Sequence, residues 1–260
     1  NRFLIRFSEF VERKLYTKAD ALTVHSEGNK EHVINVGASP EKVHVVPNWV
    51  DLNRYRKGTN RNSWRRTNDI DDRFMVSFAG TMGFAQGLDS VLEAADLLKN
   101  EDDIVFVLCG EGVLKRTVEN RVSESGLANV KILPPQDAED YLALLQTSDV
   151  CLVVLHRDLK TPVVPGKLQC IMAVGKPVIC LANPASDVPK IIQEAECGIF
   201  ITNGEPDIFA EAVLSLRNNS ETRRCMGQRG RRYAEEKFDR TRNIRAYDEI
   251  LTSHRPDSNP

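Results

Sequence analysis

The sequence lacks the features that mark membrane-spanning, disulfide-bonded and zinc-binding proteins. None of its six cysteines forms a C-x-x-C pair, and Cys109, Cys151 and Cys180 lie inside apolar runs, as expected of buried residues in a reducing cytosol. No signal peptide is recognisable, and no apolar run approaches the length of a membrane span. We therefore expect a cytoplasmic protein that binds no metal.

A strong net charge is also missing. Lysine and arginine number 35 against 37 aspartates and glutamates, which gives a formal net charge of -2. A nucleic-acid-binding domain usually has a basic surface with interleaved aromatic residues, so we expect no nucleic-acid partner. The 260 residues suffice for one large domain or two small ones. Because the chain starts at Asn1 inside a helical pattern, we expect a fragment of a longer protein.

Short apolar runs alternate with helical patterns from Phe74 onward. The runs are continuously apolar, as in strands that are buried on both faces of a parallel sheet. Between them, apolar residues recur at helical spacing, for example at Leu88, Val91, Leu92 and Leu98. This alternation predicts an α/β fold with a Rossmann-like, doubly wound parallel sheet. The predicted strands are residues 74–80, 104–110, 130–133, 150–155, 176–182 and 198–202.

The two ends of the chain differ from this pattern. Residues 1–50 predict an amphipathic helix, a short strand, a second helix and a second short strand. A polar, positively charged stretch at 53–73 predicts a linker with one helical turn. From Glu221 the charged sequence predicts a closing helix pair with a frayed tail at 253–260.

The first helix places cations opposite phenylalanines. Such a helix can lie on a membrane surface, or its apolar face can cover a sheet. The interspersed Glu9 and Glu12 favour packing against protein. The cations are Arg2, Arg6, Arg13, Lys14 and Lys18, and the phenylalanines are Phe3, Phe7 and Phe10.

Two turns that lead from a strand into a helix are candidate ligand sites, because ligands of open α/β sheets bind at the carboxyl ends of strands. In FAGTMGFAQG, three glycines let the backbone approach a ligand with its N–H groups outward. A loop that needs glycine only for its dihedral angles is the alternative. The turn is neither a P-loop nor a G-x-G-x-x-G motif.

The second turn is VPGK, where Gly166 and Lys167 open a helix that Gly175 ends. Free N–H groups and the helix dipole favour a phosphate at such an N-terminus. A lysine in a first helical turn is otherwise unfavourable. Lys167 therefore predicts a bound anion or a nearby carboxylate, with a solvated lysine as the alternative.

A third candidate is the CGEG turn, where Glu111 either borders a nucleotide or caps the following helix. His25 and His156 each follow an apolar strand, but isolated histidines are seldom catalytic. The sequence shows no Ser/His/Asp order, metal-ligand spacing or paired carboxylates. The residues alone predict a cytosolic α/β protein that binds a phosphate-bearing ligand.

The order FAGTMGFAQGLDSVLEAADLL, VLCGEG, VKILPPQ, SDVCLVVL and VPGKLQCIMAVGKPVI resembles the carboxy-terminal domain of family 4 glycosyltransferases. These are retaining enzymes with the two-Rossmann GT-B architecture. The branch that looks most similar serves bacterial polysaccharide, O-antigen or colanic-acid biosynthesis. The resemblance implies the end of an N-terminal domain at 1–52, a linker at 53–73, a nucleotide-sugar-binding domain at 74–238, and a closing helix with a tail at 239–260.

The resemblance also implies which residues meet the donor, although it assigns no catalytic residue. The donor diphosphate is expected between the glycine-rich turn and the VPGK segment, with the base and ribose beside them. The diphosphate-binding residues would be Gly80, Thr81, Gly83, Gln86, Gly166 and Lys167. The residues of the base and ribose region would be Gly110, Glu111, Leu133, Pro134 and Cys170.

Four positions depart from the commoner pattern of this family. Thr81 and Gln86 stand where two phosphate-binding cations usually occur. Pro162 and Cys170 stand where two glutamates usually contact the ribose and the donor sugar. Part of the family combines VP-x-K with A-Q-G, so we interpret the departures as marks of a branch.

The function that the resemblance implies is transfer of a sugar from a UDP- or GDP-sugar, without a metal, to build a cell-surface polysaccharide or glycolipid. A sugar or lipid-linked acceptor would bind the N-terminal domain, with peripheral contact at the inner face of the membrane. This chain alone is expected to be inactive. The alternatives are a non-catalytic nucleotide-sugar-binding module or partner subunit, and a nucleotide-sugar 2-epimerase.

Overall fold

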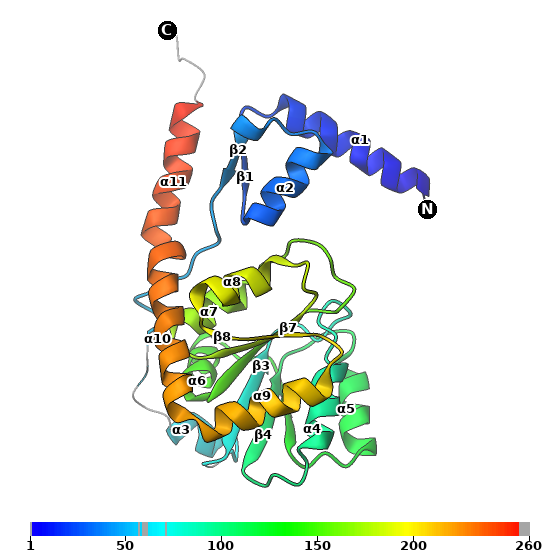
Figure 1. The fold of residues 1–260 in the computed structure, drawn as a ribbon, viewed down its shortest axis with the longest axis vertical. Coiled ribbons are helices and arrows are strands. Elements are labelled where there is room, and N and C mark those ends of the chain that lie inside the picture. Colours follow the sequence, from blue (N-terminus) through cyan, green and yellow to red (C-terminus); the bar gives the residue numbers. More distant parts are fainter. Residues whose placement is uncertain (1, 57, 59–61, 71, 255–260) are drawn as a thin grey trace.

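The computed structural model describes residues 2–56, 58, 62–70 and 72–254. A small lobe is built from the first part of the chain, and a large lobe surrounds a six-stranded sheet (Figure 1). Most of the predicted frayed tail, residues 255–260, lies outside the described residues, as do several residues of the predicted linker.

Six parallel strands form the centre of the large lobe, in the order β5-β4-β3-β6-β7-β8. The chain winds outward in one direction from β3 and in the other from β6, so the winding reverses between these two neighbours. This arrangement confirms the predicted doubly wound parallel sheet. The strands are β3 (Phe74–Ala79), β4 (Ile104–Cys109), β5 (Val130–Leu133), β6 (Val150–Val154), β7 (Val178–Ala182) and β8 (Gly198–Thr202).

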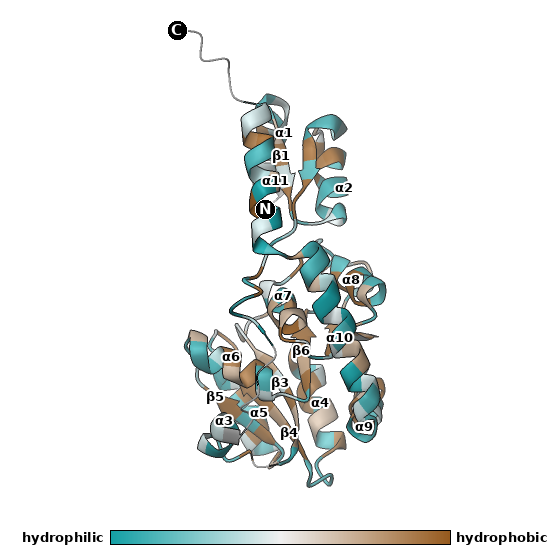
Figure 2. Ribbon diagram, turned by 90° about the vertical axis from the view of Figure 1, so that its left-hand side faces the viewer, coloured by the Kyte–Doolittle hydropathy of each residue, from teal (hydrophilic) through white to brown (hydrophobic). Residues whose placement is uncertain are grey.

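Helices cover both faces of this sheet, because alternate side chains of its central strands are buried on opposite sides. Phe106 and Leu108 of β4 pack with α4, α5 and α9, whereas Val105 and Val107 pack with α3, α6, α7, α8 and α10. The strands are the most hydrophobic part of the ribbon (Figure 2). The helices are α3 (Asn62–Thr67), α4 (Asp89–Leu97), α5 (Lys115–Glu124), α6 (Ala138–Thr147), α7 (Gly166–Ala173), α8 (Asp187–Ala195), α9 (Pro206–Asn218) and α10 (Ser220–Lys237).

The small lobe contains a two-stranded parallel sheet and a small core. Its buried residues are Val33, Ala38 and Val43. The elements are α1 (Arg2–Lys18), β1 (Leu22–Val24), α2 (Glu27–Val36), the 3-10 turn η1 (Pro40–Lys42) and β2 (Val43–Val45).

The last helix, α11 (Arg240–Ser253), extends from the large lobe along the small one (Figure 1). The side-chain amide of Asn243 donates to the carbonyl of Pro47 at 2.9 Å, and the rings of Trp49 and Tyr247 meet edge to face at 5.7 Å. The helix pair predicted from Glu221 is thus present as α10 and α11. It ties the end of the chain to the junction between the lobes.

The stretch 53–73 contains more structure than a polar linker. Trp64 of α3 is buried in the core, and the helix packs on α6. The guanidinium of Arg65, 8% exposed, donates to the carbonyl of Thr147 at 2.7 Å and pairs with Asp149 at 2.6 Å. A buried arginine looks like a surface residue in a sequence, which is why the polarity of this stretch predicted a linker.

We expect Arg65→Ala to lower the free energy of unfolding by about 3 kcal/mol, because it leaves the largely buried carboxylate of Asp149 and the buried carbonyl of Thr147 without their guanidinium. Urea denaturation measures the loss. The exposed neighbour Arg66 provides the control, since Arg66→Ala should cost about 0.5 kcal/mol or less. Similar losses in the two variants would contradict a structural role for Arg65.

Candidate functional site

The glycine-rich turn after β3 is held in place by neighbouring loops at the carboxyl edge of the sheet. The N–H of Gly80 donates to the carbonyl of Cys109 at 2.9 Å, and that of Met82 donates to the carbonyl of Glu111 at 2.8 Å. Farther along, the side-chain amide of Asn203 donates to the carbonyl of Gly87 at 3.2 Å. The turn is therefore a fixed part of the fold.

Two positions at this edge have positive φ angles that favour glycine, and other groups approach both closely. A Cβ on Gly80, whose φ is +147°, would lie 2.7 Å from Nζ of Lys167. A Cβ on Gly110, whose φ is +153°, would lie 1.8 Å from the carbonyl oxygen of Gly80. The structure thus brings together the turn after β3, the turn after β4 and the start of α7.

Lys167 carries a charge that the described part of the chain does not neutralise. Its Nζ lies 3.9 Å from the centre of the Phe78 ring, and no described residue gives it a carboxylate or a hydrogen bond. Burial lowers the pKa of Lys167 to about 8. The side chain is partly exposed, so water solvates the ammonium less well than at a fully exposed position, and no ion pair among the described residues compensates for this.

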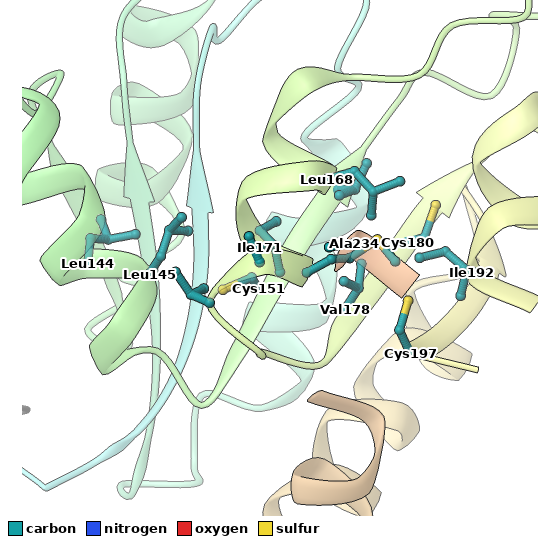
Figure 3. Close-up of a cluster of buried hydrophobic side chains, with 14 of the residues drawn as sticks. Leu144, Leu145, Cys151, Leu168, Ile171, Val178, Cys180, Ile192, Cys197 and Ala234 are labelled. Atoms are coloured by element: carbon teal, nitrogen blue, oxygen red, sulfur yellow. The ribbon is translucent and has the colours of Figure 1, made fainter. Parts of the chain in front are cut away.

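The first turn of α7 adds backbone donors to this charge. Leu168 and Ile171 anchor the helix against β6 and β7 (Figure 3). Pro165 precedes the first turn and gives it no side-chain cap. Among the described residues, the N–H groups of Gly166 and Lys167 have no hydrogen-bond partner. The first turn of α7 thus contributes two amides without a partner among the described residues and the positive end of the helix dipole, and it carries the lysine whose ammonium reaches Gly80.

The turn Gly80–Gly83 offers fewer donors than the sequence predicts. The amide of Gly80 is bonded to Cys109, and the N–H of Gly83 donates to Oε1 of Gln86 at 3.1 Å. Buried backbone groups are nearly always paired, and this turn pairs most of its own. Within Gly80–Gly83, the N–H of the exposed Thr81 is left without a hydrogen-bond partner among the described residues.

Leu133 and Pro134, predicted to meet the base, lie at the end of β5. The carbonyl of Leu133 accepts the N–H of Gly110 at 3.0 Å, and the carbonyl of Pro134 accepts the Cys109 thiol at 3.0 Å. The backbone here is thus joined to the turn after β4, on the side of β3 away from β6.

Glu111 is exposed and forms an ion pair with Lys115 at 2.9 Å, which lowers the pKa of the carboxyl. This ion pair ties the Glu111 side chain to the first turn of α5.

Cys170 lies on α7 against two tyrosines that the sequence analysis missed. Burial raises the pKa of the Cys170 thiol, and it raises the pKa of Tyr55 to about 12 and that of Tyr141 further. The two rings meet edge to face at 6.5 Å. Tyr55 is in the stretch predicted as a linker, and nothing in the sequence pattern links it to α7.

The small lobe touches α8 and the segment that leads into α7. A Cβ on Gly28 would lie 2.4 Å from Oδ1 of Asp187, and the side-chain amide of Asn29 donates to the carbonyl of Pro162 at 2.6 Å. A cavity of about 510 Å³ lies beside this contact, and His25 is part of its lining. No sequence signal marked this contact, because it joins residues more than 130 positions apart.

His156 lies elsewhere, beside Gly87 at the end of the glycine-rich turn. Its Nδ1 accepts the N–H of Asp158 at 3.2 Å. The two candidate histidines therefore do not form one catalytic group. Among the described residues, no group of three or more histidines, cysteines and acids is placed to hold a metal.

Comparison with known proteins places the chain among sugar transferases. The family model described as glycosyl transferases group 1 matches residues 60–233, which is more than half of the chain. The chain belongs to this family. A second model, described as glycosyltransferase family 4, matches residues 1–54. Residues 55–59 separate the two matches.

Relatives of this chain are named for different glycosylation reactions. A protein of Escherichia coli K12 named as a colanic acid biosynthesis glycosyl transferase is 29% identical over 209 residues, which cover 79% of this chain and 51% of that protein. A D-inositol 3-phosphate glycosyltransferase of Corynebacterium efficiens is 24% identical over 84% of this chain and 53% of its own length. The chain thus spans about half the length of these curated relatives.

Solved structures show the same fold. Anabaena HepE in complex with UDP-glucose superposes with a TM-score of 0.83 at 18% identity, over 94% of this chain and 67% of that one. The C-terminal domain of a glycosyl transferase group 1 protein, LpcC of Francisella tularensis, gives 0.62 at 21% identity over 74% of this chain and 99% of that one. The predicted GT-B-type architecture is confirmed.

We expect Lys167→Met to stabilise the ligand-free chain at pH 7. Folding lowers the pKa of Lys167 from 10.5 to about 8. Below pH 8 the group is protonated in the folded chain, and its burial in charged form lowers the free energy of unfolding. The advantage of methionine should shrink as the pH rises from 8 to 10, where the folded wild type has lost the proton. Thermal unfolding at pH 7 and pH 10 measures this, with the exposed Lys160→Met as control. A destabilised Lys167→Met at pH 7 would point to a structural role instead.

Proposed function

We propose that this chain is the donor-binding part of a glycosyltransferase that transfers a sugar from a nucleotide diphosphate to a growing polysaccharide or glycolipid. The observation that carries the proposal is the ammonium of Lys167 beside Gly80, which has no ion-pair partner in the described part of the chain and lies where the winding of the sheet reverses. Membership of the family and the names of the relatives support the reaction class.

The proposed mechanism places the donor diphosphate between the glycine-rich turn and the first turn of α7. When the bond between the sugar and the diphosphate breaks, negative charge grows on the leaving group. The ammonium of Lys167 and the free amides of Thr81, Gly166 and Lys167 stabilise that charge. Since the chain supplies a full positive charge and a helix dipole here, the proposal includes no metal.

A UDP-sugar is the donor that we favour over a GDP-sugar. A structural neighbour, Anabaena HepE, was solved with UDP-glucose bound, which supports a uridine nucleotide in this fold. The backbone of Leu133 and Pro134 would meet the base, and Gly110, Glu111 and Cys170 would border it and the ribose. The acceptor, a sugar or lipid-linked sugar, would bind the N-terminal domain.

A non-catalytic nucleotide-sugar-binding module is the second candidate. Pro162 and Cys170 bring no carboxylate to the start of α7, and this lack favours a binding role over turnover. Assay of the longer protein with a lipid-linked acceptor separates the two, because a binding module takes up the donor without releasing nucleotide.

We expect UDP to bind the wild-type chain and to bind Lys167→Ala at least about tenfold more weakly at pH 7, since a charged hydrogen bond to phosphate is lost. Affinity of the wild type should fall between pH 7 and pH 9 as the ammonium deprotonates, and that of the variant should stay level. Calorimetry with UDP and GDP measures both, with Lys160→Ala as control. Equal binding by wild type and Lys167→Ala would remove Lys167 from the site.

The peripheral membrane contact that the resemblance implies would fall on α1. Phe7 and Phe10 are 57% and 58% exposed, and Arg6, Arg13 and Lys14 lie on the same helix. The side chains of Arg2 and Phe3 lie outside the described residues. Among the helices described, none is both long enough and apolar enough to cross a bilayer.

If α1 rests on the membrane, the chain should float with vesicles that contain anionic phospholipid, and Phe7→Ser with Phe10→Ser should abolish flotation. The matched control is Leu97→Ser with Ile208→Ser, two exposed apolar residues of the large lobe. Flotation that is equal for both double variants would assign α1 to packing against protein, as Glu9 and Glu12 favour.

A further inference from the structure

A second positively charged cavity lies at the opposite end of α7 from the candidate donor site. Its volume is about 780 Å³, and its lining includes Gly175 and Lys176, which follow the end of α7. The eight residues of α7 rise about 12 Å, so this cavity and Lys167 lie at different edges of the sheet. Helix α10 forms the other wall of the cavity.

The lining has a strong excess of positive charge, although the chain as a whole has a formal net charge of -2. It contains six cations and two carboxylates. Both carboxylates already have a guanidinium partner: Asp149 pairs with Arg65 at 2.6 Å, and Glu235 pairs with Arg231 at 2.6 Å. The six cations are Arg56, Lys176, Arg223, Arg224, Arg231 and Arg232.

Helix ends explain the placement of some of these cations. The ammonium of Lys176, 8% exposed, donates to the carbonyl of Ser148 after α6 at 2.7 Å, and Arg231 donates to the carbonyl of Ala173 at the end of α7 at 2.6 Å. These bonds satisfy carbonyls at the negative ends of two helices. Carbonyls are neutral, however, so the formal charge of the lining remains.

Two arginines of the lining have no structural role of this kind. The side chains of Arg56 and Arg232 are exposed, and neither has a hydrogen bond or ion pair within the described part of the chain. They reach the cavity from different elements, Arg56 from the junction between the lobes and Arg232 from α10. Guanidinium groups bind phosphate through paired hydrogen bonds, which suits such an arrangement.

We propose that this cavity binds a small molecule that carries a phosphate group, with Arg56 and Arg232 as its anion-binding residues. The volume lies in the range of ligand pockets and exceeds that of inorganic phosphate, so the ligand has an organic part. Ser220 and Gln228 offer polar groups to that part, and Val174 and Pro177 offer apolar surface. A concave site favours a free phosphate ester over the headgroup of a lipid in a bilayer.

The test uses the 260-residue chain with Lys167→Ala, which removes the cation of the donor site, and glycerol 3-phosphate as the probe. Calorimetry should show that glycerol 3-phosphate binds the second site with the same affinity in the Lys167→Ala chain as in the wild type. Adding Arg56→Ser and Arg232→Ser should weaken it by about tenfold or more. Adding Arg116→Ser and Arg229→Ser instead removes the same charge from exposed positions outside the lining and should leave binding unchanged.

Three results would overturn the proposal. The first is no binding of glycerol 3-phosphate in the Lys167→Ala background, and the second is equal weakening by both pairs of substitutions. The third is binding to phosphatidylglycerol vesicles, but not to phosphatidylcholine vesicles or the free ester, that is lost with Arg56 and Arg232. Because the cation of the donor site is absent throughout and the two pairs of substitutions lie outside that site, these results do not depend on the proposed transferase function.

Discussion

The ammonium group of Lys167, only partly exposed to water and without a counter-ion among the described residues, is the constraint on which the rest of the structure depends. Lys167 lies against Gly80 and the Phe78 ring, and burial holds its pKa near 8. Folding alone gains little from such a group, since its charged form is less stable there than in water. A bound anion would reverse that balance, because the same poor solvation that weakens the free ammonium strengthens its attraction for a diphosphate.

The fold of the large lobe determines where Lys167 lies. The reversal of winding between β3 and β6 opens the edge of the sheet, and the buried face of α7 fixes the helix whose first turn carries Lys167. The opposite end of α7 meets α10, whose glycines allow close contact: a Cβ on Gly227 would lie 2.1 Å from the carbonyl oxygen of Gly175. The small lobe reaches the same segment through Asn29 and Pro162. One short helix thus connects the candidate donor site, the basic cavity and the contact between lobes.

The sequence predicted the sheet well because buried parallel strands leave a continuous apolar signal. All six predicted strands are present, and their ends differ from the predicted ends by at most two residues. The largest difference is at β7, which starts at Val178, two residues later than predicted. The convergence of Gly80 and Lys167 followed from the rule that strand ends meet at one edge. The anchoring of Arg65, the Gly83–Gln86 bond and the tyrosines around Cys170 were not predictable. Each depends on a side chain that reaches a specific partner, and sequence periodicity carries no information about such contacts.

The central claim is that the ammonium of Lys167 meets the diphosphate of a nucleotide. Nuclear magnetic resonance of labelled lysine side chains can follow the titration of Lys167 directly, with Lys167→Ala to assign its signal. We predict a pKa of about 8 in the free chain and a clearly higher one when UDP is bound, because the anion stabilises the charged form. A pKa that is the same with and without saturating UDP would contradict the account.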